Sequence, residues 1–125
     1  MQIRVDHVKL PVADLERTKA FYAAALAPLG YKLVFDGPES IGFGNADRKP
    51  IAFLCTDPPS IGTHIALTAA DTAAVDAFHT AALAAGGRDN GTPGPRPFGG
   101  KYYAAFVLDP DGHNIEAVPH GEREE

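Results

Sequence analysis

The residues best suited to bind a metal ion are two histidines and a glutamate, His7, His64 and Glu116. Neutral imidazole nitrogens and carboxylate oxygens are ligands of Fe²⁺, Mn²⁺, Ni²⁺, Co²⁺ and Zn²⁺. Cys55 is the only cysteine, so neither an internal disulfide nor a cluster of thiolate ligands can form. Two imidazoles and one carboxylate around such an ion would leave coordination positions open for a substrate or water.

Strand alternation predicts that these side chains share one face of a sheet. Successive side chains of a β-strand point to opposite faces. His7 and Lys9 therefore point away from the apolar residues that alternate with them, and His64 and Glu116 do the same in their own segments. We expect the polar face of these strands to carry the metal site.

An internal repeat relates the two histidines. The sequence can be laid on itself without a gap so that several residue types coincide. The coinciding pairs include His7 with His64, Asp14 with Asp71, Phe21 with Phe78, and Gly30 with Gly87. We predict one domain, 1–125, made of two repeats at about 1–58 and 59–125, whose pseudo-twofold symmetry brings the histidines together.

Each repeat is predicted to contain a strand, a helix and further strands. Asp14 and Asp71 stand where a helix N-cap belongs, before residues with amphipathic helical spacing. Later strands are expected at 31–35, 40–44, 51–56, 102–108 and 114–118. Proline and glycine residues predict a loop over 91–100, and His79 is expected on the exposed side of its helix. The predicted fold class is α+β.

Further residues are candidates for roles beside the metal. Lys9 would neutralise an anionic substrate or an enolate, because it shares a face with the first histidine. Arg96 and Lys101 flank the predicted loop and would bind a substrate carboxylate. Tyr102 and Tyr103 alternate, so one of them faces the site as a candidate catalytic residue, and the spacing leaves open which one. For the cations, the alternative is an ordinary solvated surface position.

Length and charge narrow the class of protein. A chain of 125 residues fits a single compact domain. A formal net charge of −5 opposes binding to a phosphate backbone. The sequence shows neither a long apolar run nor the basic and apolar start of a secretory signal. We expect a cytoplasmic protein that binds a small-molecule substrate and neither nucleic acid nor membrane.

The opening D-H-V-K-L-P-V-A-D-L (6–15) and the closing L-D-P-D-G-H-N-I-E-A-V (108–118) resemble the vicinal oxygen chelate superfamily. This superfamily includes lactoylglutathione lyases, extradiol dioxygenases and bleomycin-binding proteins, and the resemblance covers nearly the whole chain. It implies two βαβββ modules that form a curved mixed sheet cup with helices on the outside. It also implies a divalent metal at His7, His64 and Glu116, and by analogy a homodimer.

One departure from the family pattern divides its activities. Lactoylglutathione lyases take a fourth ligand, usually Glu, from the last strand of the first module, where this chain offers Ala52 or Phe53. Two His and one Glu resemble the ligand set of extradiol dioxygenases. The predicted function is a metal-dependent enzyme acting on a small vicinally oxygenated substrate, as a glyoxalase-like lyase or isomerase or as a ring-cleaving dioxygenase. The alternatives are a non-catalytic binder of the bleomycin-resistance type and a structural or regulatory domain.

Overall fold

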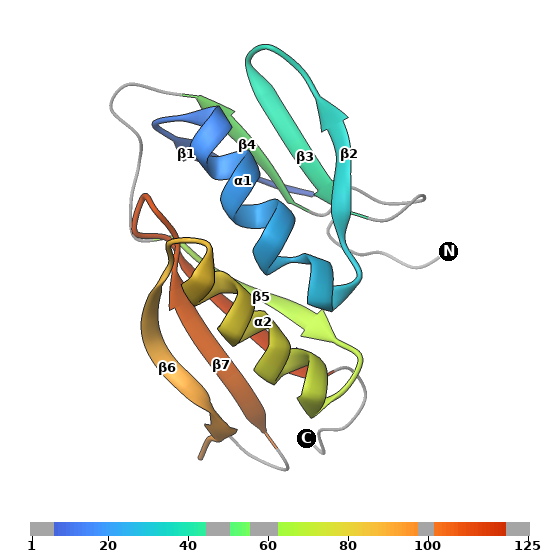
Figure 1. The fold of residues 1–125 in the computed structure, drawn as a ribbon, viewed down its shortest axis with the longest axis vertical. Coiled ribbons are helices and arrows are strands. Elements are labelled where there is room, and N and C mark those ends of the chain that lie inside the picture. The colour runs from blue at the N-terminus through green and yellow to red at the C-terminus, as the bar shows by residue number, and fades with distance from the viewer. Residues whose placement is uncertain (1–6, 45–50, 56–62, 98–101, 120–125) are drawn as a thin grey trace.

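The computed structural model describes residues 7–44, 51–55, 63–97 and 102–119. Its elements, in chain order, are β1 (Val8–Val12), α1 (Leu15–Ala25), the 3₁₀ helix η1 (Ala27–Leu29), β2 (Lys32–Asp36), β3 (Ser40–Gly44), β4 (Ile51–Cys55), β5 (His64–Ala69), α2 (Thr72–Ala84), β6 (Arg88–Pro95), β7 (Tyr103–Leu108) and β8 (Asn114–Pro119). Figure 1 shows two sheets, each with one helix packed on the same side. The predicted α+β class with two βαβββ units is confirmed.

The two sheets have the same topology. Their strand orders are β1-β4-β3-β2 and β5-β8-β7-β6. In each sheet the first strand pairs in parallel with the last, and the other neighbours are antiparallel. The strand that opens each half therefore lies beside the strand that closes it, which places their side chains next to each other.

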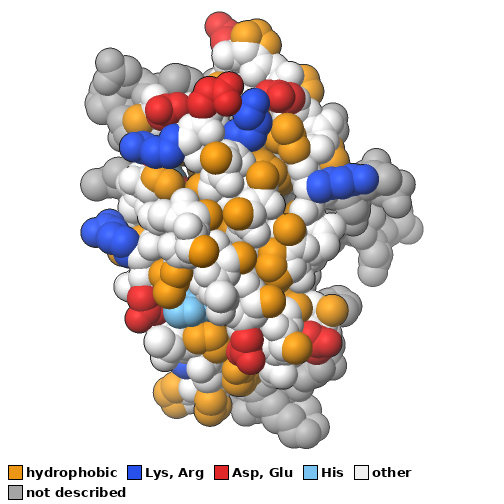
Figure 2. All heavy atoms as spheres, viewed as in Figure 1, with side chains coloured by type: hydrophobic (Ala, Val, Ile, Leu, Met, Phe, Trp, Pro, Cys, Tyr) orange, Lys and Arg blue, Asp and Glu red, His pale blue; other side chains and the backbone are white. Residues whose placement is uncertain are grey.

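Both helices begin at the predicted aspartate caps. The Asp14 carboxylate accepts a hydrogen bond from the Arg17 N–H at 3.1 Å. The Asp71 carboxylate accepts one from the Ala74 N–H at 2.8 Å. These bonds satisfy backbone donors that a first helical turn leaves unpaired. Figure 2 shows hydrophobic and charged side chains interspersed on the outer face of the helices.

The apolar face of each helix packs on its sheet, and the two helices also pack on each other. The Tyr22 ring stacks on Phe53 with centroids 4.3 Å apart and meets Phe21 edge-on at 4.8 Å. Gly87 lies at a close approach, because a Cβ there would be 2.6 Å from Val107 Cγ1 and 2.9 Å from Phe21 Cε1. Any side chain at residue 87 would therefore force these neighbours, and the Ala82 carbonyl at 2.9 Å, to shift.

Two predictions about the second half are wrong. Most of the predicted loop at 91–100 that the structure describes belongs to β6, which is an edge strand with register shifts around Gly91. Proline is tolerated there because an edge strand does not need every backbone donor. His79 is only 8% exposed, and its Nε2–H donates to Asp89 Oδ1 at 2.9 Å. The hydrogen bond to Asp89 replaces the water that the buried His79 ring loses. Helical periodicity does not show this partner, because it lies on β6 and not on the helix.

A polar clasp joins the two halves. It consists of Tyr22 from α1, Asp109 and His113 from the β7–β8 turn, and the carbonyl of Pro11 from β1. The Tyr22 hydroxyl donates to Asp109 Oδ2 at 2.6 Å, and the other Asp109 oxygen accepts from the N–H groups of Asp111 and His113. Because Asp109 is 2% exposed, these donors replace the water that its carboxylate loses.

His113 completes the clasp from the turn between β7 and β8. Its side chain is fully buried, and its Nε2 lies 3.0 Å from the Pro11 carbonyl oxygen. A carbonyl only accepts, so the Nε2–H group donates this hydrogen bond. The other ring nitrogen, Nδ1, is buried and has no hydrogen-bond partner among the described residues.

The Tyr22 hydroxyl of the clasp keeps its proton around neutral pH. Burial raises the pKa of the Tyr22 hydroxyl well above its ordinary value, and the negative charge of Asp109 raises it further. The hydroxyl therefore remains a donor to the carboxylate.

No helix in the described part of the chain is long and apolar enough to span a bilayer.

We predict that Tyr22→Phe lowers the free energy of unfolding by about 1–3 kcal/mol, because a buried carboxylate loses one donor while the ring packing is kept. Chemical denaturation followed by circular dichroism measures the change. Tyr31→Phe is the matched control, because the half-buried Tyr31 has no hydroxyl hydrogen bond within the described residues. Equal stability of Tyr22→Phe and the wild type would show that the clasp does not stabilise the fold.

Candidate functional site

A buried carboxylate with two partners forms the centre of the candidate site. Glu116 is 3% exposed. Its Oε1 lies 3.0 Å from His64 Nε2, and its Oε2 accepts a hydrogen bond from the Tyr102 hydroxyl at 2.5 Å. The His64 side chain is half exposed, so the cluster opens to solvent on the histidine side.

The register of the second sheet produces this cluster. On parallel β5 and β8, Ala66 pairs with Glu116, two residues after the pair of His64 and Asn114. Residues two apart on a strand share a face, so His64 and Glu116 point the same way. Tyr102 directly precedes β7 and also points to this face, which answers the question that the sequence left open.

The neighbouring tyrosine points to the other side, as strand alternation predicts. The Tyr103 hydroxyl donates to Asp76 Oδ1 of α2 at 2.6 Å. This bond raises the pKa of the Tyr103 hydroxyl above its ordinary value. Tyr103 therefore lies on the helix side of the sheet, away from Glu116, and is not positioned to act at this site.

Lys9 lies on β1 of the first sheet, and His7 directly precedes this strand. Together with Phe35, Gly42 and Ala52 they line a pocket of about 370 Å³, completed by Ser40 and Ile41. The pocket is on the face of the first sheet that is equivalent to the Glu116 face of the second. The predicted face for His7 and Lys9 is thus the observed one.

Residues that pair across neighbouring strands form a row that crosses each sheet, and the equivalent rows of the two sheets differ in a complementary way. In the first sheet, the row from β1 to β2 is Lys9, Ala52, Gly42 and Phe35. In the second sheet they are Ala66, Glu116, Phe106 and Gly91. Each position is large or charged in one sheet and small in the other. Ala52 therefore occupies the position equivalent to Glu116, so the first half contributes no carboxylate there.

The donor atoms match part of the coordination sphere of a divalent ion. Adjacent ligands of an octahedral ion with bonds of about 2.1 Å are about 3.0 Å apart. The separation of His64 Nε2 and Glu116 Oε1 equals this value. Among the residues that the structure describes, no three His, Cys, Asp or Glu side chains are grouped closely enough to bind one metal. The structure thus brings His64 and Glu116 together within the chain and leaves His7 just before β1 of the other sheet.

The structure describes only one of the two basic residues that were predicted to bind the substrate. Arg96 lies over the ring of Phe106, with its Cζ 5.4 Å from the ring centroid. The same ring is 6.0 Å from His64, centroid to centroid, which places Arg96 beside the cluster. Lys101 lies outside the described residues. Sequence reasoning missed Phe106 and Phe35, although their places on alternating strands were a usable signal.

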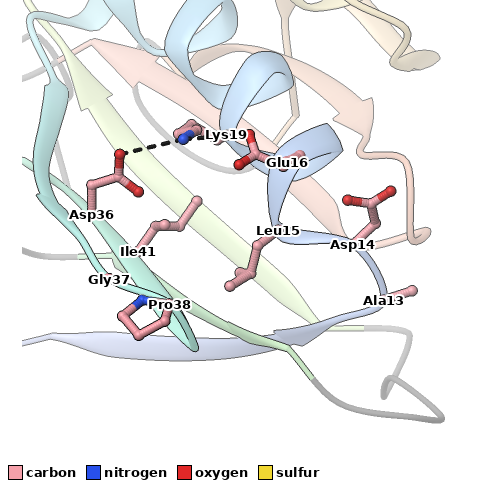
Figure 3. Close-up of a pocket in the computed structure, with 9 residues that line it drawn as sticks. All are labelled: Ala13, Asp14, Leu15, Glu16, Lys19, Asp36, Gly37, Pro38 and Ile41. Carbon is pink, nitrogen blue, oxygen red and sulfur yellow. Dashed lines mark hydrogen bonds and ion pairs between the residues drawn. The ribbon is translucent and has the colours of Figure 1, made fainter.

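A second cavity, of about 400 Å³, lies at the start of α1 and is a different kind of site. Figure 3 shows Lys19 between acidic side chains of the helix and of β2. Its Nζ is 3.3 Å from Asp36 Oδ2 and 3.4 Å from Glu16 Oε2, and these contacts raise the pKa of Lys19, with Asp36 as the main cause. The ion pairs of Lys19 tie α1 to β2. The residues that line this cavity include carboxylates but neither a histidine nor a tyrosine.

Comparisons with known proteins identify the family to which this fold belongs. A sequence profile of the glyoxalase/bleomycin resistance protein/dioxygenase superfamily matches residues 4–117. A search of curated proteins gave no match. A glyoxalase/bleomycin resistance protein from Albidiferax ferrireducens is 29% identical, with a TM-score of 0.80 over 92% of this chain and 97% of that one.

Two more distant structures share the fold. One is a glyoxalase/bleomycin resistance protein/dioxygenase family enzyme from Burkholderia phytofirmans, which is 18% identical with a TM-score of 0.73 over 94% of this chain and 98% of that one. The other is a glyoxalase-related enzyme from Fulvimarina pelagi, which is 22% identical with a TM-score of 0.73 over 97% of this chain and 95% of that one. The profile match spans nearly the whole chain, and the chain therefore belongs to the glyoxalase/bleomycin resistance protein/dioxygenase superfamily.

Proposed function

We propose that the protein is a divalent-metal-dependent enzyme whose substrate is a small molecule with oxygens on adjacent carbons. The observation that carries the proposal is the buried Glu116 carboxylate, held by His64 on one oxygen and by Tyr102 on the other. An imidazole, a carboxylate and a phenol that converge at a solvent-facing opening are a combination typical of catalytic sites.

The residues of the cluster have separate roles in this proposal. His64 and Glu116 would hold Fe²⁺, Mn²⁺, Ni²⁺, Co²⁺ or Zn²⁺, which when bound would stabilise negative charge on a substrate oxygen. Tyr102 would exchange a proton with the substrate, because its hydroxyl lies at the cluster and donates a hydrogen bond to Glu116 Oε2. Lys9, on the equivalent face of the first sheet, would stabilise an anionic substrate that lies between the two faces.

The third ligand is proposed to come from a second copy of the chain. His7 and His64 occupy equivalent positions in the two repeats, yet His7 directly precedes β1 of the first sheet and His64 begins β5 of the second. A twofold dimer in which the first half of one copy faces the second half of the other would bring His7 beside the Glu116 cluster. The complementary rows of large and small residues support this pairing. Lys9 would then face the small Ala66, and Phe35 would face Gly91.

Within the superfamily, the position of Ala52 favours the ring-cleaving branch. A lyase or isomerase of the glyoxalase kind needs a base opposite Glu116 to move a proton between carbons. Ala52 offers none. In ring cleavage, a carbon–carbon bond beside the two hydroxyl-bearing carbons breaks, one O₂ is consumed, and both of its oxygen atoms enter the product.

We predict that the wild type retains about one Zn²⁺ per chain after loading and desalting, and that Glu116→Gln retains about a tenth of that or less, because a neutral amide replaces the charged ligand. Elemental analysis measures the content, and circular dichroism checks the fold. Glu39→Gln is the matched control, because Glu39 is exposed. Unchanged metal content in Glu116→Gln would show that the carboxylate is not a ligand.

The shared site can be tested by mixing two defective chains. His7→Ala and Glu116→Gln homodimers should each lose the metal. In a mixed dimer both changes fall in one site and the other site is intact, so about one ion per dimer should be retained. Differently tagged chains, co-expressed and purified through both tags, provide the sample for elemental analysis. A mixed dimer without metal would place all ligands of each site in one chain and contradict the exchange.

The reaction class is tested by aerobic assay of the Fe²⁺-loaded protein with catechol and 3,4-dihydroxybenzoate. We expect a coloured ring-opened product, and we expect Tyr102→Phe to retain the metal while turnover falls about 10²-fold or more, because a proton-transfer group is lost. Absorbance and oxygen uptake follow the reaction. Metal binding without turnover of either compound would exclude the ring-cleaving branch for these substrates and favour a lyase. Ligand capture without metal would instead indicate a non-catalytic binder.

A further inference from the structure

Arg96 is fixed on the same face as the candidate site. Its backbone N–H donates to the Tyr102 carbonyl at 2.7 Å, so these two residues lie opposite each other at the ends of the β6–β7 ladder. Residues that face each other across an antiparallel pair project to the same side. Because the Tyr102 hydroxyl reaches Glu116, the Arg96 side chain starts on the Glu116 side of the sheet.

The side chain then runs back along β6 in a trough made by two glycines. A Cβ at Gly94 would lie 3.4 Å from Arg96 Nη1, and a Cβ at Gly91 would lie 3.1 Å from Nη2 and 2.8 Å from the Phe106 ring. Gly91 also has a φ of +156°, a backbone conformation that residues other than glycine rarely adopt. The glycines therefore make room for the guanidinium over Phe106.

Neutral carbonyl groups hold the guanidinium, and no carboxylate of the described residues forms an ion pair with it. Nη1 donates to the carbonyls of Gly94 and Pro95 at 3.0 and 3.3 Å, and Nη2 donates to that of Thr92 at 2.6 Å. An arginine has five N–H donors. Within the described part of the chain two of these therefore have no acceptor, and Arg96 forms no ion pair there.

The charge of Arg96 lowers the pKa of one nearby carboxyl group, that of Asp89. Its pKa is lowered, mainly by the hydrogen bond from His79, then by the Gly91 N–H, and to a smaller extent by Arg96. Asp89 is thus occupied by its own partners. The guanidinium remains available to an incoming anion.

We infer that Arg96 binds a carboxylate of the substrate, so that the substrate class is a small vicinally oxygenated molecule that also carries a carboxylate. The inference rests on the proposed function for the vicinal oxygens, and on the Arg96 geometry alone for the carboxylate. The two remaining donors would bind the carboxylate oxygens with charge assistance. Phe106, between Arg96 and His64, would set the distance from the carboxylate to the reacting end of the substrate.

The carboxylate site is tested first in metal-free protein, so that the result does not depend on the metal. Benzoate and benzamide are the probes, because they have nearly the same shape and differ in charge. The NMR signal of the Arg96 Nε–H is expected to shift with benzoate at millimolar concentration and to stay in place with benzamide. No shift with benzoate, or an equal shift with both probes, would overturn the inference.

A second measurement uses Zn²⁺-loaded protein, in which catechols are not consumed because the ion has no redox chemistry. Calorimetry should give about tenfold or tighter binding of 3,4-dihydroxybenzoate than of catechol, and Arg96→Gln should abolish the difference. Arg88→Gln is the matched control, since it removes the same charge from an exposed residue of β6. A preference retained in Arg96→Gln would contradict the inference.

The two proposals fail differently. If the proposed metal site is wrong, the wild type takes up no Zn²⁺, while the benzoate shift in metal-free protein is still expected. If only the carboxylate site is wrong, Zn²⁺ binds in the wild type and in Arg96→Gln alike, and 3,4-dihydroxybenzoate binds no better than catechol. Arg96→Gln should leave the Zn²⁺ content unchanged in either case.

Discussion

The candidate site depends on the pairing of one buried carboxylate. A carboxylate removed from water is strongly destabilised unless donors replace the solvent. Glu116 obtains its partners from two directions, an imidazole on the neighbouring parallel strand and a phenol at the start of β7. The parallel register of β5 and β8 is therefore more than a feature of the fold. It makes a polar cluster at this depth energetically acceptable, and it presents a carboxylate oxygen and an imidazole nitrogen side by side.

Duplication of the fold did not duplicate the chemistry. The two sheets have the same strand order, yet the rows that cross their open faces carry opposite choices of large and small residues. The second half holds the carboxylate, and the first half holds Lys9 and an open pocket around it. Each half thus supplies what the other lacks. The arrangement is consistent with two halves that face each other across a shared space.

Most of the fold could be predicted from the sequence because its signals are local. Aspartate caps and alternating strands depend on near neighbours, so both helices and most strands were found. β6 was missed because its prolines and glycines are acceptable only at a sheet edge, which is a tertiary property. The pair of His64 and Glu116 follows from alternation and pairing order. The position of Arg96 could not be predicted in this way. It depends on the space left by Gly91 and Gly94, and these glycines predict a loop when only the sequence is considered.

The clasp between the halves has a consequence for the proposed dimer. Tyr22 and Asp109 join the halves within one chain, while each proposed site would draw its halves from two different chains. Every chain would then take part in both sites, and its clasp would link them as a rigid connection. Asp109 lies at the turn that leads directly into β8, the strand of Glu116. In such a dimer, the clasp would be the contact through which a shift of β8 at one centre reaches α1, and with it the half of the chain that serves the other centre.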